Sequence, residues 1–318
     1  MSDQILISIC IPAYKGIEFL KRLLDSIAIQ NFKNFEVVIT DDSPDNSVRE
    51  LSSAYHDKFS LNYYRNESPL GTPANWNKAI ENASGKWIKL MHDDDWFADE
   101  NSLGHFAEAI TQNPSTSFIF SAYRNHYLDT GRTNDVFVDS SRLNILQKNP
   151  ATLFSRNIIG PPSVVLHKKT ARVQYDPAIK WVVDIDFYIR YLHDEKSPVY
   201  INKILVNVGI GEQQVTQDCF RQRPIEIPEN FYLLGKVGVV QLKNIFIYDA
   251  WWRLMRNLQI TREKEIVESG YSGKIPTVIS SMVSWQRKIP ARILQTGIFS
   301  KAFMFVHYLL NYGRISSN

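Results

Sequence analysis

The chain has 318 residues, of which 44% are hydrophobic and 22% charged, and its formal net charge is +3. These values are ordinary for a soluble globular protein with a sizeable core. Only two cysteines occur, Cys10 and Cys219, and their spacing indicates neither disulfides nor a zinc site, which fits a reducing cytoplasm. The first four residues lack the basic region of a signal peptide, and no apolar run approaches the ~20 residues that span a bilayer. We therefore expect a cytoplasmic protein whose contact with a membrane is at most peripheral.

Strand and helix patterns alternate over the first hundred residues. Short apolar runs predict buried strands at residues 6–11, 35–40, 61–64 and 87–91. Helical spacing of apolar residues predicts helices at 18–29, 47–55 and 73–82. Such alternation is typical of βαβ units, so we predict an α/β fold with a Rossmann-like, mainly parallel sheet flanked by helices.

Three of the predicted strands end in groups suited to binding a ligand: Pro12-Ala13-Tyr14, Asp41-Asp42 and Asp93-Asp94-Asp95. In parallel sheets, ligands bind at the carboxyl ends of the strands. Three adjacent carboxylates raise one another's proton affinity, and a hard divalent cation relieves that cost. A solvated acidic loop is the simpler explanation of the triplet taken alone. The glycine-rich loops of common nucleotide folds are absent, so side chains and a metal would have to hold any phosphates.

These residues resemble the family 2 inverting glycosyltransferases, which have the GT-A fold. The resemblance rests on the following segments and residues: Ser8-Ile9-Cys10-Ile11-Pro12-Ala13-Tyr14, Phe35-Glu36-Val37-Val38-Ile39-Thr40-Asp41-Asp42-Ser43, Gly71, Asn77, Ala83-Ser84-Gly85-Lys86-Trp87-Ile88 and His92-Asp93-Asp94-Asp95. Their order and strand context agree with the family over roughly residues 5–105, and weaker similarity extends to about residue 215.

The resemblance implies a nucleoside diphosphate sugar as donor, with a UDP-sugar favoured, and Mn²⁺ or Mg²⁺ as cofactor. The residues that it assigns to the nucleotide are Pro12, Ala13, Tyr14, Asp41, Asp42, Asn77 and Asp93. A cap at a helix N-terminus is the alternative role for the Asp41-Asp42 pair. We expect Asp94 to be the direct metal ligand, supported by Asp95. His92 stands where the family usually has its first acidic residue.

Inversion requires a carboxylate that deprotonates the acceptor hydroxyl. By position in the family pattern, Asp184 is the predicted base, although the acid that often precedes it is Val183 here. Asp186 is the alternative base, and with Trp181 it is assigned to the acceptor site. Both carboxylates could instead simply favour a helix N-terminus, and Trp181 could be a core residue. Many relatives carry a His near the diphosphate where this chain has Gly211, so that Gln213 or Gln214 would have to replace it.

The last fifty residues differ in charge from the rest of the chain. Residues 269–318 contain no Asp or Glu, whereas they contain six basic residues: Lys274, Arg287, Lys288, Arg292, Lys301 and Arg314. The stretch 231–259 is predicted to be largely helical and is rich in Leu, Trp and Tyr, and the stretch 281–312 combines aromatic and aliphatic residues with several of these basic residues. Basic amphipathic helices commonly lie at a membrane surface. Packing on the catalytic domain or on a partner subunit of a homo-oligomer is the alternative.

We therefore predict a GT-A domain over 1–225, with a nucleotide-sugar half at 1–100 and an acceptor half at 101–225, followed by a helical C-terminal region over 226–318. The predicted function is transfer of a sugar to a glycan or a lipid-linked glycan in surface polysaccharide or lipopolysaccharide biosynthesis, at the inner face of the cytoplasmic membrane. A sugar nucleotidyltransferase is less favoured, because it would need a glycine-rich basic loop at residues 12–16. A non-catalytic nucleotide-binding or scaffold protein is the third reading. Nucleic acid is not an expected partner, since no basic and aromatic pattern recurs in the main domain.

Overall fold

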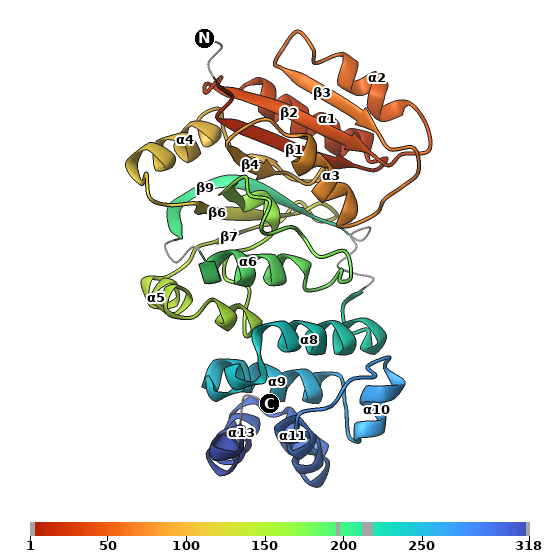
Figure 1. Cartoon of the computed structure of the whole chain (residues 1–318), viewed down its shortest axis with the longest axis vertical. Coiled ribbons are helices and arrows are strands. Elements are labelled where there is room, and N and C mark those ends of the chain that lie inside the picture. Colours follow the sequence, from red (N-terminus) through yellow and green to blue (C-terminus); the bar gives the residue numbers. More distant parts are fainter. Residues whose placement is uncertain (1–3, 195–197, 212–218, 316–318) are drawn as a thin grey trace. The chain divides into compact units, whose positions relative to one another are not determined.

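The computed structural model describes residues 4–194, 198–211 and 219–315 (Figure 1). By their contacts these residues form two compact units. The first unit contains the described residues of 1–148 and 158–212, and the second contains 149–157 together with those of 213–318. The second unit therefore includes a short segment from the middle of the chain, and it begins before residue 225, the predicted boundary.

The first unit is built on one mixed sheet with the strand order β3-β2-β1-β4-β8-β6-β9-β5, and β7 pairs with β6. The strands are β1 (Ile7–Ala13), β2 (Phe35–Asp41), β3 (Leu61–Arg65), β4 (Trp87–Leu90), β5 (Trp96–Phe97), β6 (Phe118–Tyr127), β7 (Thr133–Val136), β8 (Val165–Lys168) and β9 (Val199–Ile210). The first four strands pair in parallel, as predicted. Antiparallel pairing of β8 with β4 and with β6 joins them to the remaining strands.

Helices cover the sheet of the first unit. They are α1 (Ile17–Ala28), α2 (Ser47–Ser53), α3 (Ala74–Asn82), α4 (Ser102–Gln112), α5 (Ser140–Lys148) and α6 (Val183–Asp194), with the short 3-10 helix η2 (Pro162–Val164). All seven residues of β2 are buried, and six of the seven in β1 are. Strands buried on both faces read as continuous apolar runs, which is why the sequence predicted them clearly.

The second unit is helical. Its elements are η1 (Pro150–Phe154), α8 (Arg223–Val237), η3 (Val239–Lys243), α9 (Ile245–Asn257), α10 (Glu263–Glu268), α11 (Thr277–Lys288), α12 (Ala291–Gln295), α13 (Gly297–Asn311) and η4 (Tyr312–Arg314). Figure 1 shows α9 between α8 on one side and α11 and α13 on the other. Trp251 and Trp252 of α9 are almost completely buried in the core of this unit. The predicted helical stretch 231–259 is interrupted at Gly238, whose φ is +90°, and the stretch 281–312 is interrupted at Pro290.

These elements confirm the predicted α/β class with a helical C-terminal extension. In the part of the chain that the structure describes, no helix is both long and apolar enough to cross a bilayer.

A buried carboxylate connects the start of β2 to the loop that precedes β4. Glu36 of β2 accepts hydrogen bonds from the hydroxyl of Ser8 at 2.6 Å, from the main chain and hydroxyl of Ser84, and from the amide of Asn62. Gly85 N–H donates in turn to the Ser8 hydroxyl. Burial raises the pKa of Glu36, but the hydrogen bonds from Ser8 and from Ser84 outweigh it, so that the net pKa is lowered. The network fixes the start of β4 against β1 and β2.

We expect Glu36→Ala to lower the free energy of unfolding by about 3 kcal/mol, because several buried donors lose a charged acceptor. Urea unfolding followed by tryptophan fluorescence measures this loss, with Glu50→Ala on the exposed surface of α2 as the matched control. Since the pKa of Glu36 is lowered by folding, its contribution is full above the unfolded value of about 4.3 and is lost as the pH falls below it. A Glu36→Ala protein as stable as the Glu50→Ala protein at pH 7 would contradict this account.

Candidate functional site

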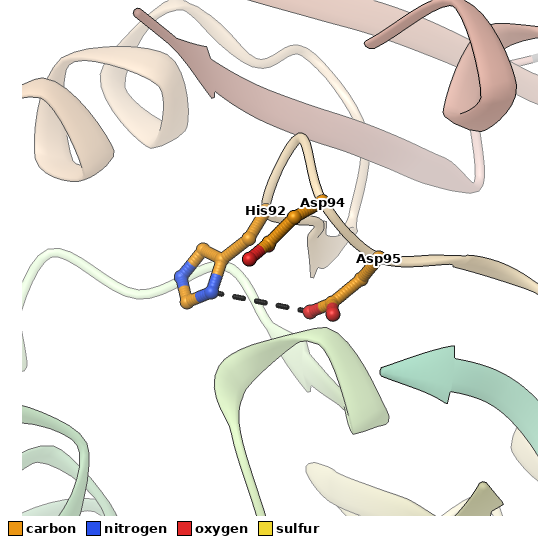
Figure 2. A group of neighbouring side chains, drawn as sticks. All are labelled: His92, Asp94 and Asp95. Carbon is orange, nitrogen blue, oxygen red and sulfur yellow. Dashed lines mark ion pairs between the residues drawn. The ribbon is translucent and has the colours of Figure 1, made fainter. Parts of the chain in front are cut away.

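Three side chains converge in the turn that joins β4 to β5. Figure 2 shows His92, Asp94 and Asp95 pointing into one space from this turn. One ligand atom from each of the three lies within 4.8 Å of the others, and His92 Nδ1 is 4.0 Å from Asp95 Oδ2. Two carboxylates and an imidazole are a donor set that suits Mn²⁺ and related divalent cations. The donors therefore fit a metal site at the place where the sequence predicted one.

Burial makes this turn electrostatically costly. Burial, followed by the charge of the neighbouring Asp94, raises the pKa of Asp93 to about 7. Burial also raises the pKa of Asp95 well above its usual range, again with Asp94 as the next cause. The pKa of His92 is lowered, because the buried ring resists protonation. The protonation states of Asp93, Asp95 and His92 thus depend strongly on the charged groups near them.

A buried lysine partly offsets this negative charge. Lys89 lies in β4 and is completely buried, and its ammonium donates to the carbonyl oxygen of Ser163. Burial lowers its pKa to about 7, whereas the charge of Asp95 acts in the opposite direction. Ser163, in η2, also accepts a hydrogen bond from His92 N–H at 3.0 Å. The segment around Ser163 is therefore part of the support of the acidic turn.

Gly209 of β9 also contacts the acidic turn. Its N–H donates to Asp95 Oδ1 at 3.0 Å, and a Cβ at this position would lie only 2.4 Å from the carbonyl oxygen of Asp94. Only glycine permits so close an approach of two main chains. The acidic turn thus depends on a residue that is more than a hundred positions away in the sequence.

The end of β1 faces the same turn. Tyr14 is 54% exposed, so its ring is accessible for stacking, and the Lys15 ammonium lies 5.0 Å from the ring centre. Lys15 and Gly16 both have left-handed backbone conformations, with φ of 57° and 54°. A Cβ on Gly16 would lie 3.2 Å from Asp93 Oδ2, which places this carboxylate beside the end of β1 rather than with the three ligand atoms.

The two carboxylates after β2 already have partners within the protein. Asp41 is fully buried and accepts from the Tyr63 hydroxyl at 2.6 Å and from Ser43 N–H at 2.7 Å. Asp42 accepts from the Asn66 amide, from Leu70 N–H and from Gly71 N–H. Asp42 therefore holds the loop 66–71 beside the carboxyl ends of β1 and β2. Neither carboxylate forms a side-chain cap on α2, since that helix has none.

Helix α3 connects the acidic turn to the segment that leads into α6. The ring of Trp76 lies 4.7 Å from the ring of His92 and 5.2 Å from that of Tyr175. The next residue, Asn77, exchanges two hydrogen bonds with the main chain of Tyr175. Tyr175 in turn stacks on Phe187 of α6 at 4.1 Å. Asn77, which we assigned to the nucleotide, is thus engaged in positioning this segment.

The predicted acceptor-side residues lie at the start of α6. Asp184 is partly exposed, and Oδ1 accepts from Ile185 N–H at 2.8 Å. Burial raises the pKa of Tyr175, and the negative charge of Asp184 is the second cause of this increase. Asp186 is completely buried and paired with Arg190 at 2.5 Å. Trp181 is half-buried. Gly211 directly follows β9, whereas Gln213 and Gln214 lie outside the described residues.

Sequence reasoning missed Arg22 of α1. Its guanidinium lies 3.9 Å from the ring centre of Trp96, and the charges of Asp94 and Asp95 act on it. Its Nε and Nη2 atoms are buried without a hydrogen-bond partner in the residues that the structure describes. In the sequence, Arg22 is one basic residue among others on an amphipathic helix, so no local signal marks it. His92 was visible only as a departure from the family pattern, although its neighbours could have indicated a ligand.

This chain is similar to known glycosyltransferases in sequence and in fold. A family model described as "Glycosyl transferase family 2" matches residues 8–160. The putative colanic acid biosynthesis glycosyl transferase WcaA of Escherichia coli strain K12 is 26% identical over 223 residues, which cover 68% of this chain and 77% of that protein. An uncharacterized glycosyltransferase of Haemophilus influenzae is 27% identical over 205 residues, or 63% of this chain and 67% of that protein.

Solved structures share the fold at lower identity. S. aureus TarS in complex with UDP-GlcNAc superposes with a TM-score of 0.65 at 14% identity, covering 97% of this chain and 92% of that chain. The mannosyltransferase PcManGT from Pyrobaculum calidifontis, in complex with GDP-Man and Mn²⁺, has a TM-score of 0.55 at 10% identity, covering 99% and 89%. At such identities the likeness concerns the fold alone. Together with the family match and the relatives, it leads to one conclusion: residues 8–160 of this chain form a glycosyl transferase family 2 region, and the protein is a transferase enzyme of the GT-A fold.

Proposed function

We propose that the protein is an inverting glycosyltransferase, which moves a sugar from a nucleoside diphosphate sugar to a glycan or a lipid-linked glycan. The observation that carries this proposal is the convergence of His92, Asp94 and Asp95 at the carboxyl end of β4, beside the ends of β1 and β2. A UDP-sugar is the favoured donor. The complexes of TarS with UDP-GlcNAc and of PcManGT with GDP-Man and Mn²⁺ support a donor of this chemical class.

In the proposed donor site, the nucleoside lies across the ends of β1 and β2. The exposed ring of Tyr14 stacks on the base, with Pro12 and Ala13 beneath it. Asp42 offers a carboxylate oxygen to an N–H of the base, and Asp41 keeps that strand end in place through Tyr63 and Ser43. Asp93 lies beside Gly16, which suits contact with the ribose. Asn77 contributes by holding the segment at Tyr175.

His92, Asp94 and Asp95 are the residues that we assign to Mn²⁺ or Mg²⁺. When bound, the cation supplies charge that stabilises the departing diphosphate as a Lewis acid. Asp95 is oriented for this role by the N–H of Gly209, and His92 by the main-chain hydrogen bond to Ser163. Arg22 adds a fixed positive charge beside the two carboxylates.

We assign the catalytic base to Asp184. Its carboxylate takes the proton of the acceptor hydroxyl while that oxygen attacks the anomeric carbon. The new carbon–oxygen bond forms as the bond to the diphosphate breaks, and the electron pair leaves with the diphosphate. Asp184 is favoured over Asp186, because Asp186 is buried in an ion pair with Arg190 whereas Asp184 is partly exposed. Trp181 and the polar groups near it would contact the acceptor.

The proposed setting is surface polysaccharide or lipopolysaccharide biosynthesis at the inner face of the cytoplasmic membrane. The name of WcaA, which refers to colanic acid biosynthesis, supports a role of this kind. A sugar nucleotidyltransferase is not favoured, because β1 is followed by Tyr14 and Lys15 rather than by a glycine-rich basic loop. A nucleotide-binding scaffold without activity is the remaining alternative. The proposed contact with the membrane is peripheral and involves the C-terminal region, and packing of that region in a homo-oligomer is the alternative.

Calorimetric titration with UDP, GDP and dTDP, each with and without Mn²⁺, tests the donor class. We expect one of the three to bind, and to bind more tightly with Mn²⁺. A panel of nucleotide sugars then identifies the sugar by metal-dependent hydrolysis or transfer. Failure of all three nucleotides to bind would remove the basis of the proposal. Tight binding without any turnover, in the presence of all acceptors tried, would favour the scaffold alternative.

We expect Asp184→Asn to reduce sugar transfer by about 10² to 10⁴-fold, because the acceptor hydroxyl loses its base. The affinity for the nucleoside diphosphate should stay unchanged, since Asp184 is assigned no contact with the nucleotide. Single-turnover transfer and nucleotide titration measure the two effects separately. The matched control is Asp139→Asn, which removes an exposed carboxylate remote from α6 in the sequence. Undiminished transfer by Asp184→Asn would show that another group is the base.

We expect Gly209→Ala to reduce donor turnover by about 100-fold, because the added methyl group displaces the acidic turn. It should also weaken Mn²⁺ binding, which titration of the metal measures directly. Gly104→Ala in α4 is the control, since a Cβ there meets no atom within 4 Å. That variant should be as active as the wild type, and as stable or slightly more so. Equal Mn²⁺ affinity and turnover in both variants would contradict the proposed dependence of the turn on Gly209.

A further inference from the structure

Helix α13 buries three polar residues and exposes six large apolar residues. The residues on its buried face are Ser300, Met304, His307 and Asn311. The large apolar residues on its exposed face are Ile298, Phe299, Phe305, Val306, Leu309 and Leu310. Of these, Ile298 is 81% exposed and Leu310 is 61% exposed, whereas His307 is completely buried. On an ordinary surface helix the exposed side is mostly polar, so the exposed side of α13 is unusually apolar.

The exposed residues form one face rather than scattered points. Their spacing of three, four and seven positions repeats along the helix, so they lie above one another on the same side. Ile293 of the adjoining helix α12 is also exposed, at 39%, and α12 contacts α13. We call Ile293 together with these six residues of α13 the apolar face. Contiguous exposed apolar surface on this scale marks an interaction site.

Specific hydrogen bonds prevent α13 from turning this face inward. His307 Nδ1 is 2.7 Å from the Tyr248 hydroxyl of α9, and Nε2 is 2.8 Å from the Ser281 hydroxyl of α11. Ser300 accepts from Trp252 Nε1 at 3.1 Å. Rotating the helix would leave these buried polar groups without partners, which is costly. The exposure of the apolar face is therefore a fixed property of this fold.

The positive charge of α12, α13 and η4 favours an anionic partner for the apolar face. Arg292 lies on α12, Lys301 lies on α13 and Arg314 follows directly, and all three are exposed. No acidic residue occurs anywhere from 269 to 318. A second copy of the chain placed against this face would bring like charges together, whereas an anionic lipid surface would neutralise them. With 15 residues, α13 is about 22 Å long, which is too short to span a bilayer but suits a helix lying in its surface.

We propose that the apolar face of α12 and α13 inserts into the interface of an anionic lipid bilayer, with Arg292, Lys301 and Arg314 against the lipid phosphates. This inference deepens the membrane contact named in the proposed function, but it rests on α13 and not on the donor chemistry. The partner is the bilayer surface itself. A lipid-linked acceptor would then be reached at the surface to which the enzyme is bound.

Sedimentation of the full-length protein with sucrose-loaded vesicles tests the proposal, without nucleotide present. We expect binding to vesicles that contain phosphatidylglycerol and much weaker binding to pure phosphatidylcholine vesicles. The double variant Phe305→Ser/Leu309→Ser should bind the anionic vesicles at least about tenfold more weakly, because two inserted side chains are lost. Arg292→Gln/Lys301→Gln should weaken binding by about tenfold and reduce its salt dependence. The control is Val267→Ser on α10, which removes a side chain of similar exposure (56%) in the same unit and should bind like the wild type.

Two results would overturn the proposal. One is vesicle binding that the Phe305→Ser/Leu309→Ser exchange leaves unchanged. The other is a dimer in sedimentation equilibrium that this same exchange dissolves, without binding to either vesicle, since the face would then be an interface between copies. Donor hydrolysis in the absence of vesicles is measured on the same variants and should be unaffected. A failure of vesicle binding is thereby distinguished from a failure of the proposed sugar transfer.

Discussion

Repulsion among three adjacent carboxylates is the constraint on which the rest of the first unit depends. The turn between β4 and β5 is buried enough to raise the pKa of Asp93 to about 7, so it persists only because other groups hold it. Gly209 donates to Asp95 from β9, Lys89 places a buried ammonium beneath the turn, and Ser163 binds the main chain of His92. Lys89 belongs to the strand that precedes the turn, whereas Ser163 and Gly209 come from distant parts of the sequence. These supports keep one possible ligand atom from each of His92, Asp94 and Asp95 within 4.8 Å of the others.

The sequence predicted the parts of this site that are local. Strands β1, β2 and β4 are continuous apolar runs, and the groups at their ends follow them directly, so both the strands and their shared edge could be recognised. The supports could not be recognised, because Gly209 and Ser163 reach the turn only through long-range pairing and the burial of Lys89 depends on that same pairing. Nothing near Gly209 indicates that its backbone lies against Asp94, and Lys89 reads as an interruption in an apolar strand. The family resemblance assigned Asn77 to the nucleotide site, but in the structure its side-chain amide is hydrogen-bonded to the main chain of Tyr175.

The helical unit shows the same division between what is local and what is not. The absence of acidic residues after position 269 is visible in the sequence, and it indicated an anionic partner. The sequence does not indicate which side of α13 faces the protein, because Ser300 and His307 look like the exposed polar side of an ordinary amphipathic helix. Only the hydrogen bonds to Trp252, Tyr248 and Ser281 reveal that this polar face is the buried one. A hydrophobic pattern gives the period of a helix, but tertiary contacts decide which side faces the protein.

The central claim is that the turn at His92, Asp94 and Asp95 binds a divalent cation together with the donor diphosphate. Electron paramagnetic resonance of free Mn²⁺ tests it most directly, by titrating the wild type, Asp94→Asn and the exposed-site control Asp129→Asn with and without UDP. We predict that the wild type and the control remove Mn²⁺ from solution, and that UDP tightens this binding. Asp94→Asn should bind Mn²⁺ weakly and show no effect of UDP beyond that of free nucleotide. Equal binding and equal UDP dependence in Asp94→Asn and the wild type would contradict the claim.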